Sequence, residues 1–419
     1  MTGIKMLVKM GLLSLLLLGI VITQPACWDR REVEELGIVL ATAVEPAPGG
    51  RVRVIVQNIN PAALGKGMAG GGGGAGVTVT GSKPYRNRSI EGDTVFEALR
   101  ELSRQTPRQL FFAHNQVILV SEKLARERGV KEVMDFFERN PQIRRTTWLL
   151  VGRGDLKALL DEPGRLEDTP AQRIFGIINE RRLNSRYAVQ MLGDFLEMME
   201  SGITQPYTAV IERIYNQAAP EEHKNRLAEG HIAEPHQIIR INGTAVFRRD
   251  KLAGWLNSKE SRGLLWVRGK VTGGVIDIPD PDRAGRRISL EILHSKAKLQ
   301  PVVSDGRIYM TVDVSAESNL GETTGPLDLT RPEKIKKLEA LQAAAIRDEI
   351  ESALTKAQQE YGVDVFGFGE AVHRRYPRQW KEIKEDWPEL FPGVPVNIHV
   401  ETKIRRTGMI TNPAEPKQQ

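Results

Sequence analysis

Residues 332–361 read PEKIKKLEALQAAAIRDEIESALTKAQQEY and form the strongest helical pattern in the chain. Apolar residues recur along this stretch at steps of three and four, which places them on one face of a helix. Pro332 suits the first helical turn, where its missing N–H is not needed. A helix of this length spans about 45 Å, and its single apolar face predicts that it lies across a sheet. The apolar positions are Ile335, Leu338, Leu341, Ala345, Ile346, Ile350, Leu354, Ala357 and Tyr361.

Strand patterns flank this helix on both sides. Residues 308–314 are mostly apolar, and residues 394–400 alternate apolar residues with others, as a half-buried strand does. We therefore expect a C-terminal domain over residues 301–408, in which the long helix packs on a sheet. Residues 409–419 are polar and are expected to form a disordered tail.

The chain before residue 301 divides into two further blocks. Residues 27–205 alternate strand and helix patterns, which predicts a mixed sheet with helices packed on it. A glycine tract at residues 65–76 cannot build a core and is expected to be a flexible loop. Residues 206–300 are expected to form a β-rich middle domain. Together the blocks predict an α+β protein of three mixed α/β domains, each a sheet with packed helices. The specific expectations are helices at 171–182 and 188–200, and strands at 209–214, 238–247, 264–267, 275–278 and 288–299.

Residues 1–26 have the pattern of a bacterial lipoprotein signal peptide. Two lysines precede an apolar run at residues 10–22, which is shorter than the roughly 20 residues that a membrane-spanning helix needs. Cys27 is the only cysteine of the chain and follows directly after Ala26. A lone cysteine cannot form an internal disulfide, so its expected use here is a lipid anchor. An uncleaved N-terminal anchor and a buried free cysteine are the alternatives.

Composition restricts the class of partner. The formal net charge is +6, and removal of residues 1–26 takes away two lysines and no acids, which leaves +4. This small excess slightly favours an anionic membrane surface and indicates no nucleic-acid partner. The mature chain from residue 27 is long enough for two or three domains.

Three motifs that suggest cofactor or metal chemistry fail on their context. Residues 65–70, GKGMAG, match G-x-G-x-x-G, but more glycines follow where the dinucleotide fingerprint requires a helix. Residues 76–83, GVTVTGSK, reverse the last two positions of a phosphate loop. Pro235 lies within the group of His231, Glu234 and His236, so one helical face cannot gather these side chains on a metal. We expect no cofactor and no metal.

The best site-like cluster is Asp364, Glu370 and His373, around the sequence FGFG at 366–369. The glycines permit tight turns there, and the aromatic residues can pack on the long helix. Carboxylates and a histidine without a defined geometry are common structural partners. The sequence therefore favours packing over catalysis for this cluster, and no catalytic residue is expected.

Five short blocks occur in an order and spacing that are specific when taken together. They are CWDRREV at 27–33, FFAHNQ at 111–116, NGTAVF with KLAGWL at 242–256, DVFGFGE at 364–370 and PRQWK at 377–381. These blocks resemble the Ger(x)C spore germination lipoproteins, the C subunits of nutrient germinant receptors. The glycine tract resembles an individual insertion, and Gln24-Pro25 departs from the usual residues before the lipidated cysteine.

The resemblance implies a protein tethered by a lipid on Cys27 to the outer face of the spore inner membrane. It implies two integral membrane partners, the A and B subunits, three mixed α/β domains, and no catalytic residue. Only Cys27 carries over as a functional position.

Two hypotheses follow from these observations. In the first, the chain is a non-enzymatic receptor subunit needed for germination in response to nutrients. In the second, it is a solitary membrane-tethered lipoprotein that binds a small nutrient, or an envelope hydrolase, with residues 364–373 as its pocket. Missing pocket and nucleophile motifs favour the first.

Overall fold

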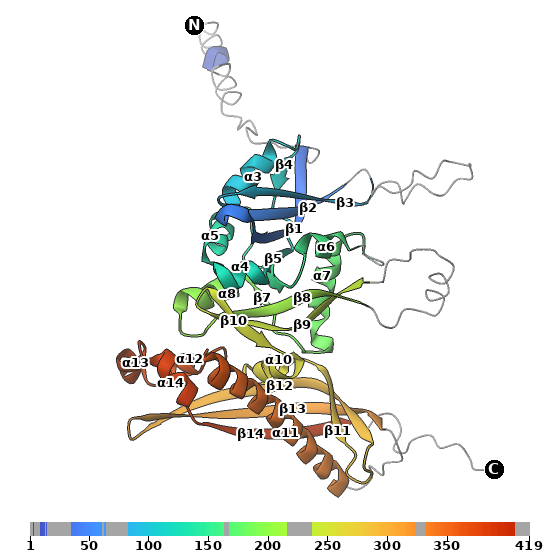
Figure 1. The fold of residues 1–419 in the computed structure, drawn as a ribbon, viewed down its shortest axis with the longest axis vertical. Helices are drawn as coiled ribbons and strands as arrows, with labels where there is room; N and C mark the ends of the chain where they lie inside the picture. Colours follow the sequence, from blue (N-terminus) through green and yellow to red (C-terminus); the bar gives the residue numbers. More distant parts are fainter. Residues whose placement is uncertain are drawn as a thin grey trace, which may run out of the picture.

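The computed structural model describes residues 35–60, 83–162, 167–215, 237–323 and 332–406, together with residues 3, 9–12, 14 and 63. Cys27, the glycine tract at 65–76, the group from His231 to His236 and the expected tail at 409–419 lie outside the described residues. The described segments form two sheets with helices packed on them, so the α+β class is confirmed (Figure 1).

The first sheet has a parallel centre and antiparallel edges. Its strands are β1 (Leu36–Pro46), β2 (Val52–Ile59), β3 (Tyr85–Gly92), β4 (Gln109–Phe111), β5 (Val117–Ser121), β6 (Trp148–Gly152), β7 (Gln190–Met191), β8 (Tyr207–Tyr215), β9 (Gln237–Arg248) and β10 (Lys251–Leu256). The order is β10-β9-β8-β6-β5-β1-β2-β3, while β4 pairs with β1 and β7 with β6. Strands β1, β5, β6 and β8 are parallel, and hairpins extend the sheet on each side.

Helices cover both faces of this sheet. On one face lie α3 (Val95–Ser103), α4 (Glu122–Glu127), α5 (Lys131–Arg139) and α8 (Leu192–Ser201), and on the other lie α6 (Leu156–Asp161) and α7 (Pro170–Asn179). Strand β2 alternates between them, because Val54 and Val56 face the first group and Ile55 faces the second. All five residues of β5 are buried, as in a parallel strand that is covered on both faces.

The second sheet consists of β11 (Gly274–Pro279), β12 (Arg287–Ser304), β13 (Arg307–Thr323) and β14 (Val396–Arg406), in that order. Strand β14 is parallel to β13 and the other pairs are antiparallel. Helix α11 (Pro332–Leu354) lies across one face and buries Ile346 and Ile350 in a core with Val312 and Val314 (Figure 1). The π-helical segment η4 (Thr355–Tyr361) continues α11. The predicted helix on a sheet is confirmed, with a wider pitch over its last seven residues.

Short helical segments complete the chain. Four of them connect η4 to β14: α12 (Phe368–Arg375), α13 (Pro377–Ile383), α14 (Trp387–Leu390) and η5 (Phe391–Gly393). The turn η2 (Pro48–Gly50) joins β1 to β2. The helix expected at 171–182 is present as α7 followed directly by the 3-10 turn η3 (Glu180–Leu183). The helix expected at 188–200 begins later than predicted, because Gln190 and Met191 pair with β6 before α8 starts.

The strand expected at 264–267 is wrong. These residues lie in α10 (Ser258–Val267), which starts with a capping box. The Asn257 side chain accepts hydrogen bonds from the backbone N–H groups of Lys259 and Glu260 at 2.9 and 3.0 Å, and the Glu260 carboxylate accepts one from Asn257 N–H at 2.7 Å. This reciprocal cap sets the helix start, and burial of α10 between the two sheets accounts for the apolar run (Figure 1).

The segment expected as a middle domain, residues 206–300, has no sheet of its own. Its first strands, β8 to β10, complete the first sheet, and its last strands, β11 and β12, open the second. Helix α10 lies between them, and its buried residues share a core with residues of both sheets, including Tyr207 and Val312.

Candidate functional site

The carboxylate of Asp364 is buried, with 3% of the residue exposed, and both of its oxygens are bound by donors. Oδ1 accepts hydrogen bonds from the backbone N–H groups of Phe366, Gly367 and Phe368 at 3.2, 2.9 and 3.1 Å. Oδ2 accepts from Gly369 N–H at 2.7 Å and from Trp387 Nε1 at 3.1 Å. Burial raises the pKa of this carboxyl, and the donors oppose the shift. The carboxylate caps the start of α12 and fixes α14 beside it.

The other two residues of this cluster turn to different partners. Glu370 accepts a hydrogen bond from the Thr204 hydroxyl at 2.6 Å, and its second oxygen lies 4.0 Å from Arg268. The His373 ring stacks on Trp380 with a centroid distance of 5.8 Å. All three residues are described, and no hydrogen bond or ion pair joins their side chains. Their contacts support packing, the interpretation that the sequence favours for this cluster.

A buried ion pair joins α10 to α11, and sequence reasoning missed it. Arg262 and Glu349 are 4% and 7% exposed. One Glu349 oxygen accepts from Arg262 Nη2, and the other accepts from Arg262 Nε and from Trp266 Nε1, both at 2.8 Å. Arg262 Nη1 donates to the Val275 carbonyl of β11 at 2.7 Å. The one available signal in the sequence was that Glu349 lies beside Ile346 and Ile350 on the apolar face of the long helix.

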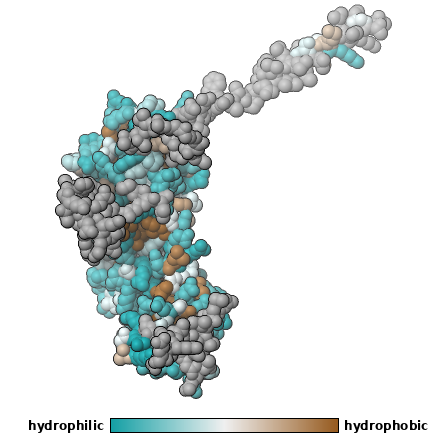
Figure 2. Space-filling view, turned by 90° about the vertical axis from the view of Figure 1, so that its right-hand side faces the viewer, coloured by the Kyte–Doolittle hydropathy of each residue, from teal (hydrophilic) through white to brown (hydrophobic). Residues whose placement is uncertain are grey.

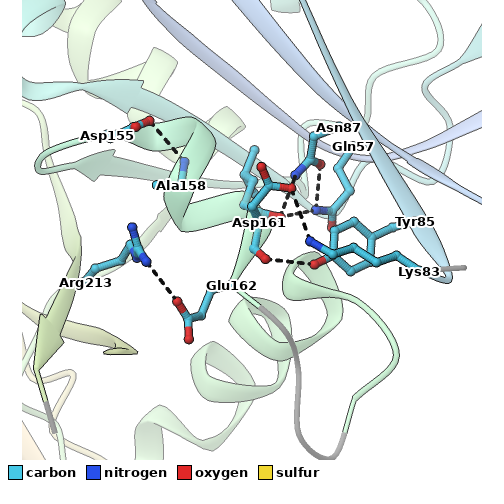
Figure 3. Close-up of polar contacts among 10 residues, drawn as sticks. Gln57, Lys83, Tyr85, Asn87, Asp155, Ala158, Asp161, Glu162 and Arg213 are labelled. Carbon is cyan, nitrogen blue, oxygen red and sulfur yellow. Dashed lines mark hydrogen bonds and ion pairs between the residues drawn. The ribbon is translucent and has the colours of Figure 1, made fainter. Parts of the chain in front are cut away.

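A second buried polar network lies at the end of α6 (Figure 3). The Gln57 amide nitrogen donates to the Leu160 carbonyl at 2.8 Å and to the Asn87 side chain at 2.9 Å. Asn87 donates to the Leu160 carbonyl at 2.7 Å and to the Asp161 carboxylate at 2.8 Å, and the Tyr85 hydroxyl donates to the Asp161 carbonyl at 3.0 Å. These donors satisfy carbonyls that a helix end leaves unpaired, so the network has a structural role.

A cavity of about 900 Å³ lies between α3 and α5. Figure 2 shows the side of the molecule that is on the right in Figure 1. There, hydrophobic residues gather at mid-height within a mostly hydrophilic surface. Exposed apolar side chains of the molecule include Leu183 in η3 and Val275 in β11, two elements that are in contact.

Neither a metal-binding group of side chains nor a membrane-spanning helix is found in the described segments. They contain no group of three or more His, Cys, Asp or Glu side chains placed to hold a metal ion. Among the same residues, no helix combines the length and apolar character that a membrane crossing requires. Cys27 lies outside them, so its expected lipidation stays a prediction.

Comparisons with known proteins cover almost all of this architecture. The family model described as "Spore germination protein N-terminal domain" matches residues 29–213, and the model "Spore germination B3/ GerAC like, C-terminal" matches residues 242–408. Spore germination protein KC of Bacillus subtilis (strain 168) is 29% identical over 97% of this chain and 98% of its own length. Spore germination protein B3 of the same organism is 23% identical over 92% of this chain and 94% of its own.

A solved structure shares the fold. The crystal structure of the GerBC protein covers 87% of this chain and 96% of its own, with a TM-score of 0.55 and 20% identity. The two family models together match at least part of every strand in both sheets and all the helices packed on them. The chain belongs to the GerAC family of spore germination proteins, the C subunits of germinant receptors.

Proposed function

We propose that this chain is a non-enzymatic subunit of a spore nutrient germinant receptor, held by a lipid on Cys27 at the outer face of the spore inner membrane. It acts there with two integral membrane subunits, A and B, in the germination response to nutrients. The observation that carries this proposal is the match of both family models, which spans residues 29–213 and 242–408.

The geometry of the chain supports a structural rather than a catalytic role. The best site-like cluster is used for packing, because all five donors around Asp364 are aimed at its carboxylate. A carboxylate that is saturated with donors is a poor general base, since substrate protons cannot reach it.

The lipid anchor supports assembly by raising the local concentration of the chain beside its membrane partners. A single acyl chain would hold it only marginally, whereas two or more hold firmly at about 0.8 kcal/mol per buried methylene. Cys27 stands after the apolar run and two residues before the first family match.

The test compares Cys27→Ala with Trp28→Phe, a control that keeps the cysteine. We expect Cys27→Ala to leave the spore membrane fraction and to slow germination in nutrients, while Trp28→Phe does neither. Mass spectrometry of the Cys27 peptide should find acyl groups in the control. Normal germination by a fully released Cys27→Ala protein would contradict the proposal.

Assembly is tested by affinity purification of the tagged full-length chain from detergent-solubilised spore membranes. Recovery of two multi-spanning proteins with the chain supports the A and B partnership. Recovery of an acylated chain with no integral partner would contradict that partnership and favour a solitary lipoprotein.

A further inference from the structure

The cavity between α3 and α5, here called the α3–α5 groove, has an apolar interior. Its floor and walls include Val52 of β2, Leu99 of α3, Leu110 of β4 and Val133 of α5, all buried. Two aromatic rings stand over it, Phe96 on α3 and Phe136 on α5, with centroids 6.3 Å apart. Phe96 is 56% exposed, so its ring is accessible from solvent at the mouth of the groove. A volume of about 900 Å³ lies within the range of small-molecule sites.

The charges around the α3–α5 groove do not cancel. Its three acidic residues each have a basic partner, in the pairs Arg51–Asp93 at 3.5 Å, Arg128–Glu132 at 2.5 Å and Arg139–Asp135 at 2.9 Å. Two further cations line it, Arg100 and Lys131. Neither makes an ion pair within 4 Å among the described residues, although the charge of Lys131 helps to lower the pKa of Asp135. The Arg100 guanidinium lies 4.9 Å from the centroid of the Phe96 ring. The four cations that line the groove, Arg100, Arg128, Lys131 and Arg139, outnumber its three acids, so the groove presents apolar surface beside a small excess of positive charge.

We propose that the α3–α5 groove binds a small monoanion with an apolar body, such as an aryl or alkyl carboxylate. The body would pack in the apolar interior against Phe96 and Phe136, where the aromatic rings contribute contact area and stacking. The carboxylate would accept charge-assisted hydrogen bonds from Arg100, which offers a planar fork, and from Lys131. A cationic ligand of the same shape would meet the same two cations and be excluded.

This inference does not depend on the proposed receptor function, because binding is measured on the chain alone. The probes are 3-(4-fluorophenyl)propionate and its alcohol, 3-(4-fluorophenyl)propan-1-ol, observed by fluorine NMR. The protein is the full-length chain in nanodiscs of uncharged lipid, with empty nanodiscs as the blank. Since hydrogen bonds to charged groups are strong, the carboxylate should bind at least about tenfold more tightly than the alcohol.

Variants separate the charge from the apolar contact. Arg100→Gln with Lys131→Gln should remove the advantage of the carboxylate and leave binding of the alcohol unchanged. The control is Arg104→Gln with Lys123→Gln, which removes the same charge from two exposed residues outside the groove, one at the end of α3 and one in α4. This control should still bind the carboxylate more tightly than the alcohol. Phe96→Ala should weaken both probes.

Competition identifies the source of the ligand. Displacement of the bound probe by decanoate supports a lipid-derived chain, and displacement by phenylpyruvate supports a water-soluble metabolite. The proposal is overturned by equal affinity for carboxylate and alcohol, by an equal loss in the control variant, or by displacement with neither competitor. Absence of binding by both probes also overturns it and leaves the groove to a protein partner.

Discussion

Replacement of Glu349 by leucine tests whether the buried ion pair between α10 and α11 holds the two sheets together. The change leaves the Arg262 guanidinium buried with one acceptor, the Val275 carbonyl, and leaves Trp266 Nε1 without its partner. Loss of one member of a buried pair costs about 3–5 kcal/mol, because the remaining charge is desolvated and uncompensated. The stranded indole N–H adds about 1 kcal/mol. We expect the free energy of unfolding to fall by about 4 kcal/mol or more.

The double variant, Arg262→Leu with Glu349→Leu, isolates the charge from the packing. Both charges are then absent, so most of the desolvation cost disappears, and similar cases are often neutral. The Val275 carbonyl and Trp266 Nε1 still lose their partners, which sets the expected deficit relative to the wild type at about 2 kcal/mol. The double variant should therefore be more stable than Glu349→Leu alone.

The assay is urea unfolding followed by the fluorescence of the six tryptophans, of which Trp266 lies inside the cluster. The matched control is Asp348→Asn, which breaks the neighbouring Lys259–Asp348 pair between the same two helices. That pair is 2.8 Å long with side chains 44% and 68% exposed, so its loss should cost less than about 1 kcal/mol. The reasoning is refuted if Glu349→Leu costs no more than the control, or if the double variant is less stable than the single one.

Three further predictions concern close packing and protonation. Gly263→Ala would place a Cβ 2.1 Å from the Glu349 carbonyl oxygen, so we expect a loss of at least about 2 kcal/mol in urea unfolding, and wild-type stability would disprove the tight contact. Asp364→Asn turns an amide N–H₂ group toward the donors Gly369 N–H and Trp387 Nε1, so the free energy of unfolding in urea should fall by about 2–4 kcal/mol. A fall below about 1 kcal/mol would contradict this arrangement of donors. Burial raises the pKa of Tyr85 and of Tyr187 to about 12, so the native state favours neutral phenols that ionise near pH 10 when unfolded. Stability should therefore hold below pH 10 and be lost between pH 10 and 12, as the phenols ionise in the unfolded chain. The urea midpoints at pH 9 and pH 11 should differ less in Tyr85→Phe than in the wild type. An equal difference in both proteins would refute the raised pKa of Tyr85.

The sequence was informative wherever periodicity alone determines an element. The helix over residues 332–361 and the strand expected at 394–400 follow from spacing, and both are present, the strand as β14 from Val396. The helix α10 was misread because its apolar run is short, although the capping residues Asn257 and Glu260 stood before it. Such runs fit a buried strand or a buried helix, and local signals must decide between them.

Contacts between distant segments were beyond the reach of the sequence. Asp364 was recognised as part of a cluster, but its partner Trp387 lies 23 residues away, and the Thr204 partner of Glu370 lies 166 residues away. The division of residues 206–300 between two sheets has the same cause. Strand patterns predict where strands occur, whereas the choice of pairing partner depends on the whole topology.

The path of β8, β9 and β10 also limits how related chains can be recombined. The two family matches are separated by residues 214–241, which include the end of β8 and the beginning of β9, paired strands of one sheet. A chimera joined there would pair a strand from one parent with a strand from the other. Joined at Asn257 instead, just before α10, it would inherit every strand of the first sheet from one parent and every strand of the second from the other.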